Sequence, residues 1–185
     1  MPKRVAAPLL RFLGLADGPT AGAAPSRDAG DTESVRRIAS QLERLDASRA
    51  KYLAAFAYVL ARIAHADLDI DAAETSEMER SLAAISDLSE GERALVVEIA
   101  KSQARLLGGT ENYVVTREFR AISTPEQRWR LLQCLYAVAA ADGSISTIES
   151  SELVAIAEEL GFTRAEANAL RRQYREKLSV LQPKP

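Results

Sequence analysis

A short acidic run carries the strongest chemical signal in this 185-residue sequence. Asp67, Asp69 and Asp71 occupy alternate positions, and Glu74 follows three residues later. Carboxylate oxygens are the ligands that Ca²⁺ and Mg²⁺ prefer in proteins. The run therefore predicts either a divalent-cation site or a turn whose carboxylates cap the helix that follows.

The run is not an ordinary EF-hand loop. Its three aspartates match the first three ligand positions of such a loop. The sixth position, however, is Ala72 instead of glycine, and the twelfth is Met78 instead of glutamate. Any cation bound here would need a different geometry.

The same run occurs a second time with fewer carboxylates. A shift of 75 residues places residues 64–77 on residues 139–152, and seven of the fourteen positions are identical. The second copy keeps two acidic positions, Asp142 and Glu149, and has serines at the other two. It is therefore the weaker candidate for a metal site.

The first aspartate of each copy occupies an unfavourable place. Asp67 and Asp142 each continue the apolar face of a helix at its C-terminal end, where the macrodipole disfavours a carboxylate. Amides of the turn and of the next helix could compensate each charge, and so could a divalent cation. In the first case, Ile70 and Ile145 would insert the two turns into the core, and the following glutamates would complete capping boxes.

Composition excludes several classes of function. The chain has 24 Lys and Arg against 26 Asp and Glu, so no global positive field attracts nucleic acid. One Cys and one His exclude an intramolecular disulfide, a CxxC zinc site and HExxH chemistry. Cys134 follows Leu131 by three residues, which predicts a buried core thiol and not a nucleophile. We therefore expect no enzyme, no nucleic-acid partner and no small-molecule substrate.

Residues 1–31 are predicted to be a flexible N-terminal segment and linker. The first fifteen contain Lys3, Arg4 and Arg11 among apolar residues, and the next sixteen are rich in Gly, Ala and Pro. The basic tip is either a frayed terminus, which we favour, or a short stretch that docks on a membrane or partner. With the single cysteine, this leads us to expect a cytoplasmic protein, with contact to the inner face of the membrane as the alternative.

Residues 32–185 are predicted to form one all-α domain. Apolar residues recur at helical spacing, and capping-box pairs mark five of the helix starts. These pairs are Asp71/Glu74, Ser89/Glu92, Thr124/Gln127, Ser146/Glu149 and Thr163/Glu166. The predicted helices cover residues 32–45, 48–66, 71–85, 89–106, 110–122, 124–141, 146–160 and 163–181. With the internal repeat, this predicts a compact bundle of seven to eight helices built as two pseudo-symmetric halves.

Arginines gather near the end of the last predicted helix. Five basic residues lie around Tyr174 and could contact phosphate or an acidic partner: Arg164, Arg171, Arg172, Arg175 and Lys177. Glu166 and Glu176 interrupt the run. A solvated basic face near a helix C-terminus is therefore the favoured interpretation.

The repeated A-x-A-D-x-x-I-x-x-x-E motif, between two helices of an all-α domain, resembles the TerB-like family. That family includes tellurite-resistance proteins and the N-terminal domain of a membrane-anchored DnaJ-type co-chaperone. The resemblance covers residues 53–181. It implies two pseudo-symmetric helical halves, a role in stress response or assembly at the membrane, no established catalysis, and an acidic cluster proposed to bind divalent metal. The matching acidic positions are Asp67, Asp69, Asp71 and Glu74 in the first copy and Asp142 and Glu149 in the second.

Three hypotheses follow. The leading one is a non-catalytic, stress-response module that binds Ca²⁺ or Mg²⁺, or a protein partner, through the acidic turns. The alternative is a protein–protein adaptor or co-chaperone-like domain whose acidic turns are purely structural caps. No J-domain follows the helices, so J-domain activity is not expected. The third, a hydrolase that holds a catalytic metal, is disfavoured because no nucleophile or second base stands beside the run.

Overall fold

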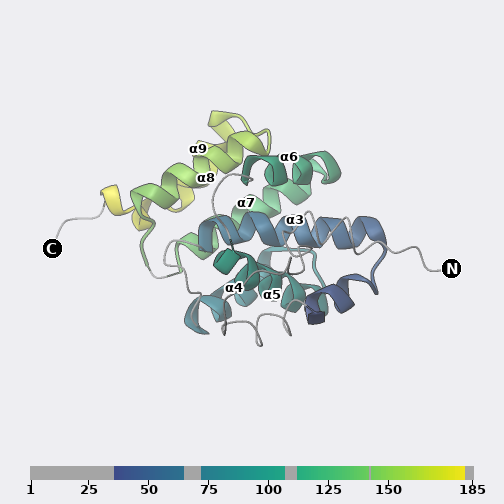
Figure 1. The fold of residues 1–185 in the computed structure, drawn as a ribbon. Helices are drawn as coiled ribbons and strands as arrows, with labels where there is room; N and C mark the ends of the chain where they lie inside the picture. The colour runs from purple at the N-terminus through teal and green to yellow at the C-terminus, as the bar shows by residue number, and fades with distance from the viewer. Residues whose placement is uncertain (1–35, 65–71, 107–111, 142, 182–185) are drawn as a thin grey trace, which may run out of the picture.

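The computed structural model describes residues 36–64, 72–106, 112–141 and 143–181, and these fold as an all-α bundle (Figure 1). Residues 36–42 form a first helix. The others are α3 (Ala47–Ala64), α4 (Ala72–Ile85), α5 (Glu90–Leu106), α6 (Asn112–Ile122), α7 (Pro125–Ala139), α8 (Thr147–Glu159) and α9 (Arg164–Gln173). Two 3₁₀ turns follow, η1 (Arg175–Lys177) and η2 (Ser179–Leu181). The predicted all-α bundle of about eight helices is confirmed.

Predicted capping boxes start four of these helices. Thr124, Ser146 and Thr163 each accept a hydrogen bond from the amide three residues later, and a Gln or Glu side chain reaches back to the cap's own amide. Ser89 and Glu92 make the same exchange before α5. The fifth pair, Asp71/Glu74, lies outside the residues whose side chains are described.

α3 is the central helix of the bundle. It crosses the middle of the molecule in Figure 1, with α4 and α5 on one side of it and α6, α8 and α9 on the other. Every residue from Tyr52 to Ala61 is buried, so this helix is covered on all faces. Its aromatic face meets α6, where the ring of Phe119 lies 5.4 Å from that of Tyr52 and 5.9 Å from that of Phe56.

The start of α3 differs slightly from the prediction. The helix begins at Ala47, one residue before Ser48, because Asp46 is its cap. The Asp46 carboxylate accepts hydrogen bonds from the amides of Ser48 and Arg49, at 3.0 and 2.9 Å. An aspartate at this position satisfies amides that have no partner within the helix.

The end of the last helix was predicted wrongly. We expected it to continue to Leu181, but α9 ends at Gln173. The next residue, Tyr174, stacks on Tyr136 of α7 with ring centroids 5.3 Å apart. Leu178 is buried and pairs with the backbone of Ile145, which draws the chain away from the axis of α9.

The helix bounds follow the internal repeat. α3 ends at Ala64 and α7 at Ala139, and α4 begins at Ala72 and α8 at Thr147. Each pair of bounds is separated by the same 75 residues as the repeated motif. Two helices separated by seven residues therefore recur, while the pseudo-symmetric packing of two halves stays a prediction. The expectations for residues 1–31 lie outside the described residues.

Candidate functional site

The turn between α7 and α8 holds the described part of the second acidic motif. Gly143 has a φ of 96°, in the left-handed region that favours glycine, and lets the chain reverse after α7. Ile145 follows and is only 1% exposed, so it inserts the turn into the core as predicted. Ser146 then caps α8.

Glu149 and Ser146 are both engaged in the cap of α8. The amide of Ser146 donates to Glu149 Oε2 at 2.7 Å, and the amide of Glu149 donates to Ser146 Oγ at 3.2 Å. A metal ion here would compete with these amides for the same two oxygens. These two residues therefore form a structural cap, and a role of Glu149 as a metal ligand stays a prediction.

The side chains of five of the six predicted ligands lie outside what the structure describes. Four of them lie outside the described residues: Asp67, Asp69, Asp71 and Asp142. Glu74 lies in the first turn of α4, and its side chain is outside the description. Among the side chains that are described, no three His, Cys, Asp or Glu are grouped so as to hold a metal ion.

The second turn also anchors the end of the domain. The Ile145 amide donates to the carbonyl of Lys177 at 2.6 Å, and the Ser179 amide donates to the carbonyl of Ile145 at 2.9 Å. These two bonds form an isolated parallel bridge between Ile145 and Leu178. The backbone of Ile145 therefore fixes the 3₁₀ turns against the bundle. This role could not be predicted from its apolar side chain.

A buried arginine joins three helices. The side chain of Arg62, on α3, is 4% exposed. Its guanidinium donates at 2.6 Å to Glu152 and to Glu159 of α8, and at 2.6 Å to the hydroxyl of Thr116 on α6. Burial lowers the pKa of Arg62, but the hydrogen bonds to Glu159 and Glu152 outweigh it, so the pKa is raised and the charge is retained.

Sequence reasoning missed the Arg62 network. The available signal was one arginine between Leu60 and Ile63 on the most apolar helix of the chain. Glu152 and Glu159 are separated by seven residues, which places them on one face of a helix. A charged residue on an apolar face requires a buried partner, and this pair supplies it.

Cys134 is a core thiol, as predicted. It is fully buried in α7 and is free. Burial raises the pKa of its thiol to about 12, so the thiolate is scarce near neutral pH. This environment disfavours a role as a nucleophile.

The comparison with known families agrees with this architecture. The described residues define a small all-α domain in which the bounds of two helix pairs repeat after 75 residues. Residues 53–172 match the model of the family described as Tellurite resistance protein TerB. The match covers more than half of the chain and includes both turns, so this protein belongs to the TerB family.

No curated protein and no solved structure matches the chain. Within the part of the chain that is described, no helix is long and apolar enough to cross a membrane.

Proposed function

We propose that this TerB-family chain is a non-catalytic, tellurite-resistance-type binding module that holds a divalent cation at its first acidic turn and engages a protein partner. Family membership over residues 53–172 supports the module type. The alternating aspartates from Asp67 to Asp71 support a hard cation such as Ca²⁺ or Mg²⁺, because they offer only carboxylate oxygens.

One observation supports different roles for the two turns, a helix cap in the second and a cation site in the first. In the second turn the Ser146 amide and the Glu149 carboxylate are joined at 2.7 Å, so this turn acts as a cap. The first turn has aspartates where the second has Ser144 and Ser146, and these extra charges exceed what one capping box uses. The proposal therefore assigns the cation to the first turn alone.

The same observation favours a second candidate function. The first turn has the matching pair Asp71/Glu74, so it can be a cap as well. The chain would then be a protein–protein adaptor whose acidic turns are purely structural. The cation titration below distinguishes the two candidates.

The test follows thermal unfolding while Ca²⁺, Mg²⁺, Mn²⁺ and Zn²⁺ are titrated. We expect Ca²⁺ or Mg²⁺ to raise the Tm of the native chain, because a ligand that binds only the folded state stabilises it. Asp69→Asn should abolish that rise. Glu149→Gln is the matched control: it should lower the Tm by the same amount with and without cation.

Two results would contradict the cation proposal. One is a native chain whose Tm does not respond to any of the four cations. The other is an Asp69→Asn variant that keeps the full response. Either result leaves the adaptor as the better account of the turns.

We also propose a cytoplasmic location, and the alternative is that residues 1–31 tether the chain to the inner face of the membrane. The single cysteine, free and buried in the fold, supports a reducing compartment. The tether is tested by removing residues 1–31 and comparing membrane fractionation. Unchanged fractionation of the shortened chain would overturn it.

A further inference from the structure

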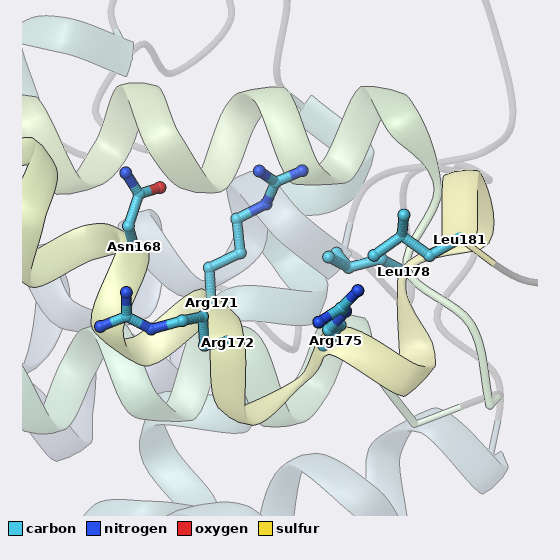
Figure 2. A pocket seen from close by; sticks show the side chains of 6 residues that line it. All are labelled: Asn168, Arg171, Arg172, Arg175, Leu178 and Leu181. Carbon is cyan, nitrogen blue, oxygen red and sulfur yellow. The ribbon is translucent and has the colours of Figure 1, made fainter.

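Three arginines line a hollow at the end of the domain. The hollow has a volume of about 370 Å³ and lies between α9 and the two 3₁₀ turns. Its lining residues are Asn168, Arg171, Arg172, Arg175, Leu178 and Leu181. Figure 2 shows Arg171 extending from α9 across the centre of the view, with Asn168 and Arg172 on one side and Arg175 and the two leucines on the other.

These arginines lack the acidic partners that other arginines of the fold have. Arg49 is paired with Glu92, and Arg164, on α9 itself, is paired with Glu158. Among the residues that the structure describes, no carboxylate forms an ion pair with any of the three arginines of the hollow. Three positive charges therefore line one concave surface without an ion-pair partner among the described residues, although Figure 2 shows the side chains of Arg171 and Arg172 pointing in different directions.

One lining arginine and a tyrosine within its electrostatic reach have unsatisfied polar groups. Arg171 Nε is buried and has no hydrogen-bond partner. The hydroxyl of the fully buried Tyr136 also has none. Arg171 lowers the pKa of that tyrosine, while burial has the larger effect and raises it, so the phenol stays neutral and does not offset the arginine's charge. Buried polar atoms without partners are rare in folded proteins and mark places where a ligand or water completes the network.

The walls of the hollow are held in place by the second acidic turn. The hydrogen bonds of Ile145 to Lys177 and Ser179 fix the segment that carries Arg175 and Leu178. Arg171 also lines a second cavity of about 400 Å³, between the start of α8 and the end of the chain. The arginines are therefore presented by a fixed frame and not by a free helix end.

We propose that this hollow binds a phosphoryl group. Guanidinium groups present two parallel donors that match the oxygens of a phosphate, and a lining with several arginines favours a dianion over a single carboxylate. Leu178 and Leu181 provide an apolar wall against which the carbon part of a phosphate ester can lie. The phosphate can belong to a soluble ester or to a lipid headgroup, since both present the same chemistry.

This site is independent of the proposed cation site. It lies on α9 and the 3₁₀ turns, and it uses none of the six acidic residues. Arg175, Leu178 and Leu181 lie beyond the matched region 53–172, so the hollow does not follow from the family match. It also revises the expectation of a merely solvated basic face.

The test is isothermal titration calorimetry of the full chain with inorganic phosphate and with glycerol 3-phosphate, at constant ionic strength. A parallel arm measures binding to phosphatidylcholine vesicles with and without phosphatidic acid. The test variants are Arg171→Gln and Arg175→Gln. Arg164→Gln is the matched control, because it removes the same positive charge from α9. Arg164 is 87% exposed and does not line the hollow.

We expect each test variant to raise the Kd for phosphate about tenfold, as expected when a charged hydrogen bond to the phosphate is lost. The control should change it less than about twofold, because an exposed charge outside the hollow is screened by salt. Binding to soluble phosphate with this pattern identifies a soluble ester as the ligand. The same pattern with phosphatidic acid vesicles alone identifies a lipid headgroup. Absence of binding in both arms, or equal weakening by Arg164→Gln, would overturn the proposal.

Discussion

Two groups of arginines in this protein differ in their burial and in their acidic partners. Arg62 is 4% exposed, and two glutamates and a hydroxyl from neighbouring helices satisfy its guanidinium. Arg171, Arg172 and Arg175 line an open hollow, and no described carboxylate pairs with them. The first environment is closed and complete, whereas the second has unused donors.

The difference shows how charge is divided between stability and binding. A buried guanidinium without partners would carry a large desolvation cost, so Arg62 requires Glu152 and Glu159. Arg172 and Arg175 are exposed, so their charges stay hydrated and carry a much smaller cost. They can therefore remain unpaired and available for an anion, provided that the backbone around them is fixed.

Replacing Arg62 should have the largest effect on stability. The side chain of Glu159 is only 15% exposed, and Arg62→Met leaves its charge without a partner. The substitution also breaks the link between α3, α6 and α8. We expect a loss of about 3 kcal/mol in the free energy of unfolding, measured by urea denaturation. Arg62→Lys keeps the charge but loses the fork of donors, and it should lie between the native chain and Arg62→Met. A loss below about 1 kcal/mol in Arg62→Met would show that the network is not structural.

Replacing Glu92 should have an intermediate and pH-dependent effect. The hydrogen bond from Arg49, with help from Ser89, lowers the pKa of Glu92 to about 2 from an ordinary value of 4.5. Glu92→Gln should cost about 1 kcal/mol at pH 7, as expected for a charged hydrogen bond at a partly exposed site.

The sign of the pH effect follows from the direction of that shift. A pKa lowered by folding stabilises the native state above pH 4.5, and this stabilisation is lost as the pH falls toward 2. Urea denaturation at both ends of this range should show the difference between native and Glu92→Gln shrinking at low pH. A difference that stays constant between pH 7 and pH 2 would contradict the assignment of the shift to Arg49.

Replacing an exposed pair should have little effect. Glu126 and Arg130 of α7 form an ion pair one helical turn apart, and Glu126 is 73% exposed. Glu126→Gln should cost about 0.3 to 0.5 kcal/mol at low salt and less at high salt. A cost above about 1 kcal/mol would mean that exposed pairs hold this fold more strongly than the contrast with Arg62 allows.

Replacing Arg175 should have the smallest effect on stability. Its side chain is exposed and has no described ion pair, so Arg175→Gln should change the free energy of unfolding by less than about 0.5 kcal/mol in the absence of phosphate. A clear loss of stability would place Arg175 with Arg62 as a structural residue and remove the contrast between the two environments.

Local rules gave most of the fold because the sequence marks its helix starts strongly. Ser146 and Glu149 make a capping box that can be recognised from their spacing, and the structure forms it. The burial of Cys134 and Ile145 likewise followed from helical periodicity and from the repeat. These features depend on residues close together in the chain.

The features that were missed depend on distant contacts. Arg62 meets Glu152 and Glu159 only when α3 and α8 pack together. The end of α9 at Gln173 depends on Ile145 reaching the backbone around Leu178. Spacing within one segment carries no information on such pairs, so the hollow of arginines could not be recognised as a cavity from the sequence.

The most direct test compares the effect of phosphate on the thermal unfolding of three proteins: the native chain, Arg62→Met and Arg175→Gln. Phosphate should raise the Tm of the native chain and of Arg62→Met by similar increments, because the hollow is intact in both. The increment should be clearly smaller in Arg175→Gln, whose Tm without phosphate should match that of the native chain. An increment that is undiminished in Arg175→Gln, or that disappears in Arg62→Met while this variant remains folded, would contradict the division between a structural arginine and a binding cluster.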